Sequence, residues 1–203
     1  MALPGREQLR SAILQYVELP GARFLRALKF TPTGVTLLGF AVTVVAACLV
    51  SFGWLLAGGI VFLSGSALDL MDGALARLTG TDSSFGALLD SVFDRLGAAA
   101  LFLGLAVYAT QGDFSDNYRL FFVIVILLAL IFSQAVSYLR ARGEGLGVFT
   151  RAGIMTRPER VVLLGVGLLA DQIEWFLLAI AVVSCVTLFQ RLFTIRRMLN
   201  KDS

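Results

Sequence analysis

The 203-residue chain contains no histidine and only two cysteines. Without histidine it lacks the usual general base and a usual zinc ligand. Cys48 and Cys185 each lie inside an apolar run, where we interpret them as small buried hydrophobic residues. Any acid–base or metal chemistry must therefore use carboxylates, which favour hard cations such as Mg²⁺ or Mn²⁺.

Charge is also scarce, because 15% of the residues are charged and 58% are hydrophobic, whereas about a quarter of a soluble domain is charged. No charged residue occurs from Gly34 to Leu68. A membrane-spanning helix needs about 20 residues, so this run is too long for one span. The composition predicts a polytopic membrane protein without a large soluble domain. The N-terminus does not resemble a cleavable signal peptide, since a short apolar run is closely followed by three basic residues, Arg23, Arg26 and Lys29.

Residues 1–30 are predicted to form an amphipathic juxtamembrane segment, with a helix over 6–30 that lies in the membrane interface. Pro20 and Gly21 should break or kink this helix. The alternative is an ordinary solvated helix packed on the membrane domain.

Residues 31–203 are predicted to form one six-helix membrane domain. Thr31 or Thr33 should cap the first span, with Pro32 in its first turn. The expected fold is an all-α integral membrane protein with six transmembrane helices after the interfacial helix. These spans are 34–52, 54–77, 85–109, 117–141, 158–170 and 175–195.

Six spans place both termini on one side of the membrane. Nearly all Lys and Arg residues fall on that side, and the positive-inside rule makes it cytoplasmic. We therefore expect a multi-pass protein of the cell membrane with a cytoplasmic active site.

Four acids lie on the expected second and third spans. Asp69 and Asp72 are three residues apart on one helix, and Asp90 and Asp94 are four apart on the next. Such spacings place each pair on one helix face, and the short connection should bring the pairs together. Converging carboxylates repel each other, and one or two divalent cations would relieve that repulsion. Two metal ions are a known arrangement for displacement at phosphorus.

Small and basic residues accompany these acids. Gly73, Ala76 and Gly86 would permit a ligand or a neighbouring helix to approach closely. Arg77 supplies a cation with forked donors that suits a phosphate. A single Asp here could be a structural ion pair, but the whole pattern favours a metal and phosphate site.

The stretch Asp69 to Asp94 reads Asp-x₂-Asp-Gly-x₂-Ala-Arg-x₈-Gly-x₃-Asp-x₃-Asp. It resembles the signature of the CDP-alcohol phosphatidyltransferase family at all eight defined positions. Such enzymes transfer a phosphatidyl group from a CDP-linked lipid to an alcohol and release CMP. The resemblance implies a membrane enzyme that acts on CDP-diacylglycerol, assembles as a homodimer and has no nucleic-acid partner.

The resemblance also implies residue roles. Asp69, Asp72, Asp90 and Asp94 would ligate Mg²⁺, or Mn²⁺, with two ions expected. Asp94 would also be the general base that deprotonates the attacking hydroxyl. The residues implied to hold CDP-diacylglycerol are Thr33, Gly34, Val35, Thr36, Gly73, Arg77 and Ser83.

The second half of the chain carries polar residues near its expected cytoplasmic ends. These are Ser137, Arg140, Arg157, Arg160 and Arg191. A basic pocket of this kind suits an acceptor that bears its own phosphate. Alternatively, the arginines are only positive-inside anchors whose side chains extend to the headgroups.

The runs Ser-Gln-x₂-Ser-Tyr and Arg-Pro-Glu-Arg are similar to those of one branch of the family, the bacterial phosphatidylinositol phosphate synthases. This similarity implies inositol phosphate as the acceptor. Glycerol 3-phosphate stays open, because both acceptors are phosphorylated. A cation or proton transporter is a remote alternative. A transporter predicts carboxylates through the membrane depth, and the last three expected spans have none at mid-depth.

Overall fold

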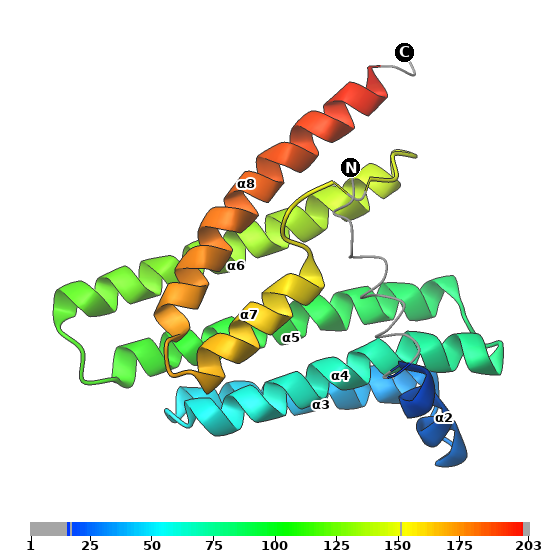
Figure 1. Ribbon diagram of the computed structural model, residues 1–203, viewed down its shortest axis with the longest axis horizontal. Helices are drawn as coiled ribbons and strands as arrows, with labels where there is room; N and C mark the ends of the chain where they lie inside the picture. The colour runs from blue at the N-terminus through cyan, green and yellow to red at the C-terminus, as the bar shows by residue number, and fades with distance from the viewer. Residues whose placement is uncertain (1–15, 17, 151, 201–203) are drawn as a thin grey trace. The chain divides into compact units, whose positions relative to one another are not determined.

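The computed structural model describes residues 16, 18–150 and 152–200, and this part of the chain is helical without strands (Figure 1). Six helices of the described residues occupy the ranges of the six expected spans, with ends that differ by about one turn or less. The helices are α2 (Leu19–Ala27), α3 (Pro32–Ser51), α4 (Leu55–Thr79), α5 (Ser84–Gln111), α6 (Asp116–Glu144), α7 (Arg157–Leu169) and α8 (Ile173–Leu199).

Five of these helices, α3, α4, α5, α6 and α8, are long and apolar enough to cross a membrane. The chain is thus a multi-pass membrane protein. Helix α7, the expected fifth span, has 13 residues and is about 20 Å long at 1.5 Å per residue. A bilayer core is about 30 Å thick, so α7 does not meet the length of a full span.

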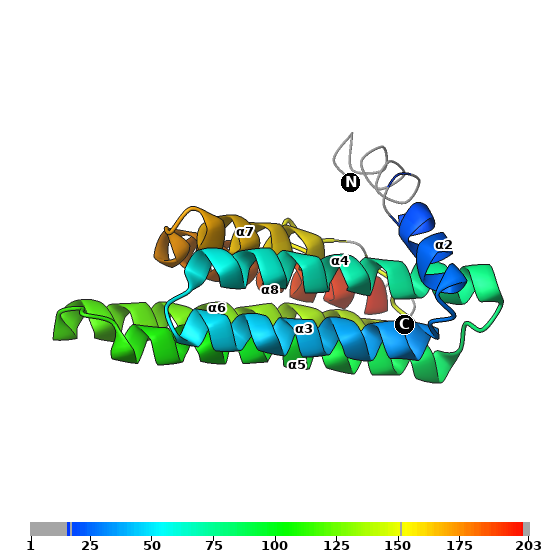
Figure 2. The same ribbon diagram turned by 90° about the horizontal axis from the view of Figure 1, so that it is seen from below.

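The chain divides into two compact units within α5, the first ending at Gly104 and the second beginning at Leu105. In the first unit, α3 and α4 pack closely because glycines replace side chains at their contacts (Figure 2). A Cβ atom on Gly65 would lie 3.1 Å from the Gly39 carbonyl oxygen, and one on Gly58 would lie 3.2 Å from that of Ala46. Thr31 caps α3 by accepting a hydrogen bond from the Gly34 N–H at 3.1 Å, which confirms one of the two expected caps.

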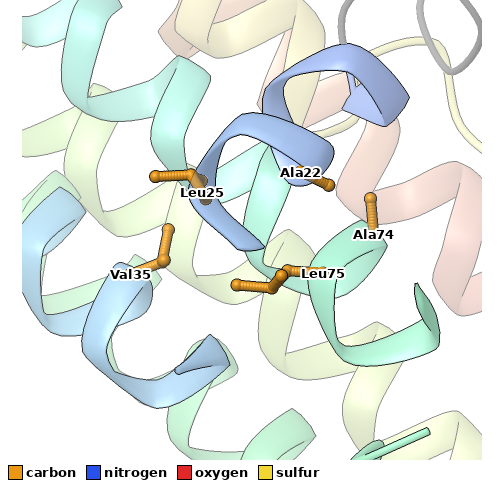
Figure 3. Close-up of a cluster of buried hydrophobic side chains, with 5 residues drawn as sticks. All are labelled: Ala22, Leu25, Val35, Ala74 and Leu75. Atoms are coloured by element: carbon orange, nitrogen blue, oxygen red, sulfur yellow. The ribbon is translucent and has the colours of Figure 1, made fainter. Parts of the chain in front are cut away.

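Helix α2 packs across the start of α3 and the C-terminal part of α4 (Figure 2). Pro20 occupies its first turn, where the missing N–H breaks no helical hydrogen bond. The expected helix start at residue 6 lies outside the described residues. Five buried apolar side chains from the three helices form one cluster, shown in Figure 3: Ala22, Leu25, Val35, Ala74 and Leu75.

The second unit is built from the end of α5 together with α6, α7 and α8. Helix α8 packs on both α6 and α7, and α7 runs back along the first part of α8 (Figure 1). A Cβ atom on Gly167 of α7 would lie 2.9 Å from Phe176 Cβ on α8, so this pair also packs closely. At the start of α6, the Tyr118 hydroxyl donates to Glu174 Oε1 of α8 at 3.1 Å.

Candidate active site

Asp72 is the buried acid of the first unit, with 6% of its surface exposed. It lies on α4, and its Oδ2 accepts a hydrogen bond of 2.6 Å from the Thr36 hydroxyl of α3. Thr36 is 5% exposed. A buried carboxylate is costly unless hydrogen bonds or a cation compensate its charge, so the structure provides a specific donor for this acid.

The other three predicted metal ligands are half-buried. Asp69 and Asp90 lie within electrostatic reach of Asp72 and repel its charge. Asp72 of α4 and Asp90 of α5 therefore lie near one another, whereas the convergence of all four acids stays a prediction. Asp94 lies one turn beyond Asp90 on α5.

Asp69 lies against a glycine of α3. A Cβ atom on Gly39 would lie 2.2 Å from Asp69 Oδ1 and 3.3 Å from the Gly65 carbonyl oxygen. A Cβ atom cannot lie this close to a carboxylate oxygen, so an alanine at position 39 would displace the Asp69 carboxylate. Gly39 therefore provides the space in which this carboxylate lies.

The donors in this region fit a hard divalent cation, because they are carboxylates that carry like charge and one of them is buried. As the side chains lie, no three Asp, Glu, Cys or His residues in the described ranges form a closed metal-binding group. Repulsion between the carboxylates favours this separation, and a bound cation would draw the carboxylates together. The ligand set Asp69, Asp72, Asp90 and Asp94 stays a prediction.

Two of the residues predicted to hold the CDP-lipid lie together on α4. A Cβ atom on Gly73 would lie 3.5 Å from Arg77 Nη1, which is ordinary contact, and apart from its own stretch of α4 it would meet no other described atom within 4 Å. Helix packing among the described residues therefore does not require glycine here, whereas a ligand could. The Arg77 side chain is 61% exposed, and its Nη2 lies 3.5 Å from Glu18 Oε2.

The remaining predicted CDP-lipid residues have distinct local roles. Ser83 lies just before α5, where its hydroxyl accepts from the Gly86 N–H at 3.1 Å. Thr33 is exposed, whereas the Val35 side chain belongs to the buried cluster of Figure 3. The Val35 N–H donates to the Thr31 carbonyl at 3.0 Å, and the Thr36 hydroxyl donates to Asp72.

In the second unit, two predicted acceptor residues are in direct contact. Arg160 of α7 donates from Nη2 to the Ser137 hydroxyl of α6 at 3.0 Å and from Nη1 to the Ser133 carbonyl. Ser133 Oγ is buried and has no hydrogen-bond partner among the described residues. Thr156 and Glu159 form a capping box at the start of α7. The box explains locally why Thr156 and Glu159 stand in this run, and Pro158 lies in the first turn, where proline is tolerated.

The other predicted acceptor residues are arranged differently. Arg191 is 3% exposed, and it donates to the Ala152 and Val136 carbonyls at 2.8 Å each. It therefore ties the connection before α7 to α6. Arg140 pairs with Glu144 at 2.9 Å rather than with Ser137 and is exposed. Arg157 is half-buried in the first turn of α7.

We expect Arg191→Lys to destabilise the protein. Lysine keeps the charge but cannot reproduce the planar fork, so at least one buried carbonyl loses its donor, at a cost of about 1–3 kcal/mol. Thermal unfolding in detergent should show a lower Tm for Arg191→Lys and an unchanged Tm for Arg197→Lys, which alters an exposed arginine of the same helix. Equal Tm values for the two variants would contradict the anchoring role.

With this geometry in place, comparison with known proteins decides the family. The model of the CDP-alcohol phosphatidyltransferase family matches residues 29–189. The chain belongs to this family. The acids of α4 and α5, Gly73, Arg77 and the second-unit arginines Arg140 and Arg157 all lie within the matched range.

Named relatives in the family cover nearly the whole chain. The phosphatidylinositol phosphate synthase of Mycolicibacterium smegmatis is 37% identical over 89% of this chain and 85% of its own length. The archaetidylinositol phosphate synthase of Pyrococcus horikoshii is 34% identical over 95% of this chain and 97% of its own.

Solved structures of the Mycobacterium tuberculosis phosphatidylinositol phosphate synthase share the fold. The complex with manganese and citrate superposes with a TM-score of 0.79 at 33% identity, covering 88% of each chain. The complex with bound CDP-diacylglycerol gives a TM-score of 0.77 at 33% identity, covering 88% of this chain and 93% of that one. The chain is thus similar to phosphatidylinositol phosphate synthases in both sequence and structure.

Sequence reasoning missed three features of these sites. It assigned Thr36 to the lipid and did not pair it with Asp72, and it gave Gly39 no role. It also did not find the contact between Arg77 and Glu18. All three involve partners at least 30 positions apart, so a local motif carries no signal for them. The glycines of α3 and α4 were the only available sign of close helix packing.

Proposed function

We propose that the protein transfers the phosphatidyl group of CDP-diacylglycerol to inositol phosphate and releases CMP. The observation that carries this proposal is the acid cluster of α4 and α5 beside Gly73 and Arg77, in a chain of this family. The relatives named above support the acceptor. The names of these two synthases differ in the lipid part, which is phosphatidyl in one and archaetidyl in the other. Both names contain inositol phosphate.

The donor is held in the first unit. Arg77 donates to the diphosphate, and the open space at Gly73 admits the nucleotide, supported by the lack of described protein atoms there. Ser83 and the turn of residues 33–36 complete the contacts. Asp94 accepts the proton of the acceptor hydroxyl. The resulting alkoxide attacks the β-phosphorus in line. The bond between the β-phosphorus and the oxygen that bridges it to the α-phosphate breaks, and CMP leaves with both electrons of that bond.

Asp69, Asp72, Asp90 and Asp94 are the residues that would hold the cations, for which we propose two Mg²⁺ ions with Mn²⁺ as a substitute. Bound there, divalent cations would stabilise negative charge on the transferring phosphate. The proposal is supported by the all-carboxylate donors and by the relative that was crystallised with manganese.

The phosphate of the acceptor is held in the second unit. Arg157 and Arg160 lie in the first turn of α7, where the helix N-terminus also favours an anion. Ser137, already in contact with Arg160, and Arg140 on α6 supply further donors. Arg191 contributes its charge and holds the preceding connection in place.

We also propose the membrane arrangement. Helix α7 completes a set of six membrane-inserted helices in residues 31–203, and α2, from the preceding juxtamembrane segment, lies in the interface. The basic ends, both termini and the active site face the cytoplasm of the cell membrane. Two copies form a homodimer with one complete site each.

A radioactive assay tests the proposed function. Purified protein with CDP-diacylglycerol and Mg²⁺ should form phosphatidylinositol phosphate and CMP when inositol phosphate is added. We expect turnover at least about tenfold lower with glycerol 3-phosphate or free inositol, because the acceptor site must match both the ring and the phosphate.

The same assay separates the alternatives. Preferred use of glycerol 3-phosphate would make the protein a phosphatidylglycerol phosphate synthase. Absence of metal-dependent CMP release with every acceptor would exclude the transferase and leave the transporter as the remaining alternative.

A further inference from the structure

The hydrogen bond between α3 and the buried acid of α4 has no part in the mechanism above. We infer that Thr36 is a positioning residue, which holds the Asp72 carboxylate in the orientation needed to bind a metal ion. The inference rests on the proposed function, in which Asp72 is a metal ligand. Its contact is to the protein rather than to substrate, since the hydroxyl lies 2.6 Å from Asp72 Oδ2.

The direction of this hydrogen bond follows from its chemistry. A threonine hydroxyl has a single proton, and Thr36 Oγ1 has two acceptors in reach, Asp72 Oδ2 at 2.6 Å and the Pro32 carbonyl at 3.1 Å. A hydrogen bond to a charged acceptor is shorter and stronger than one to a neutral acceptor. The proton therefore goes to the carboxylate, and one Asp72 oxygen is fixed.

Thr36 is itself held firmly enough to orient another group. It lies in the second turn of α3, whose first turn is fixed by the Thr31 cap and by Pro32. Its neighbour Val35 is fully buried in the cluster of Figure 3 between α2 and α4. Partners that orient a metal ligand usually change metal affinity by about 10–100-fold when they are removed.

A second buried threonine on α3 provides a matched control. Thr43 is 5% exposed, as is Thr36, but its hydroxyl donates to the Gly39 carbonyl of its own helix at 3.0 Å. Replacing either residue with valine removes a buried hydroxyl from α3. Only the replacement at position 36 removes a hydrogen bond that a carboxylate accepts.

The experiment measures Mn²⁺ binding to the full-length protein in detergent by electron paramagnetic resonance, for wild type, Thr36→Val, Thr36→Ser, Thr43→Val and Asp72→Asn. We expect Thr36→Val to weaken binding about tenfold or more. Thr36→Ser should restore it to within about threefold, because serine keeps the donor. Thr43→Val should bind as wild type does, and Asp72→Asn should lose a binding site.

Kinetics supply the second readout. The Mn²⁺ concentration for half-maximal activity should rise about tenfold in Thr36→Val, with kcat at saturating Mn²⁺ retained within about threefold. A higher KM for CDP-diacylglycerol with an unchanged Mn²⁺ requirement would overturn the inference, because Thr36 would then contact the lipid substrate. Equal weakening of Mn²⁺ binding by Thr36→Val and Thr43→Val would also overturn the inference, because both changes would then act only through helix packing.

The Asp72→Asn variant separates this inference from the proposed function. Unchanged Mn²⁺ binding by Asp72→Asn would remove Asp72 from the ligand set and thereby contradict the proposed function at that residue. Weakened binding by Asp72→Asn together with normal binding by Thr36→Val would contradict only the role of Thr36.

Discussion

Replacing Asp94 with asparagine should abolish turnover and leave the protein folded. Asparagine has nearly the same shape as aspartate but cannot accept the proton of the attacking hydroxyl, and it carries no charge for a cation. Loss of a general base alone costs about 10²–10⁴-fold in rate, and loss of a metal ligand adds to this. The measurement is CMP release from CDP-diacylglycerol with saturating inositol phosphate and Mg²⁺.

Asp82→Asn provides the matched control for this result. Asp82 is an exposed aspartate in the connection between α4 and α5, and it lies outside the eight signature positions. Its variant should keep the activity of the wild type. Circular dichroism and Tm values close to those of the wild type would show that Asp94→Asn is folded. Substantial residual turnover in that variant would exclude Asp94 as the base.

The second large effect is expected from Gly39→Ala. The new methyl carbon would lie only 2.2 Å from Asp69 Oδ1 and would overlap it. A carboxylate can rotate away more easily than a helix can move, so the change should displace the predicted metal ligand. A displacement of about 1 Å at a reacting centre can cost about 100-fold in rate. We therefore expect kcat/KM to fall about 100-fold, with weaker Mn²⁺ binding.

Gly58→Ala is the control for helix packing. A Cβ atom on Gly58 would lie 2.5 Å from Val50 Cγ2 and 3.2 Å from the Ala46 carbonyl oxygen. It thus crowds the same two helices, three turns of α4 away from Asp69. Both alanine variants should lower Tm, and only Gly39→Ala should lower Mn²⁺ affinity. Similar losses of Mn²⁺ affinity in the two variants would show that the glycines act only through helix packing.

Much of the fold followed from local sequence patterns. Hydropathy predicts membrane spans because the bilayer requires a minimum length of apolar helix, and this requirement is local. The starts of α3 and α7 follow from Thr31 with Pro32 and from Thr156 with Pro158. At α2, the helix begins at Leu19, so that Pro20 lies in its first turn, and most of the expected helix before this point lies outside the described residues. Proline is well tolerated in a first turn.

The acid cluster was partly predictable for the same reason. Helix periodicity places Asp69 with Asp72 and Asp90 with Asp94 on shared faces. The short connection from Thr79 to Ser84 then keeps the two pairs at one end of their helices. Which acid is buried, and what contacts it, depended on α3, whose contribution has no fixed spacing from the motif.

The arginines show the limit of sequence reasoning most clearly. In the sequence, Arg160 and Arg191 cannot be told apart, because both are basic residues near the ends of apolar helices. In the structure, Arg191 is buried and donates to two backbone carbonyls, whereas Arg160 contacts Ser137 and the Ser133 carbonyl. The direction in which a long flexible side chain points is set by the acceptors that packing brings near it.

The sequence by itself determined the membrane-spanning architecture, the face that carries the acids and the family signature, because hydropathy, helix period and motif spacing are properties of short segments. Only the tertiary structure decided that Thr36 holds Asp72, that Gly39 makes room for Asp69 and that Arg191 anchors the connection before α7. Each of these is a contact between segments at least 30 residues apart. Such contacts form only when helices pack, and the packing depends on the side chains of both partners together.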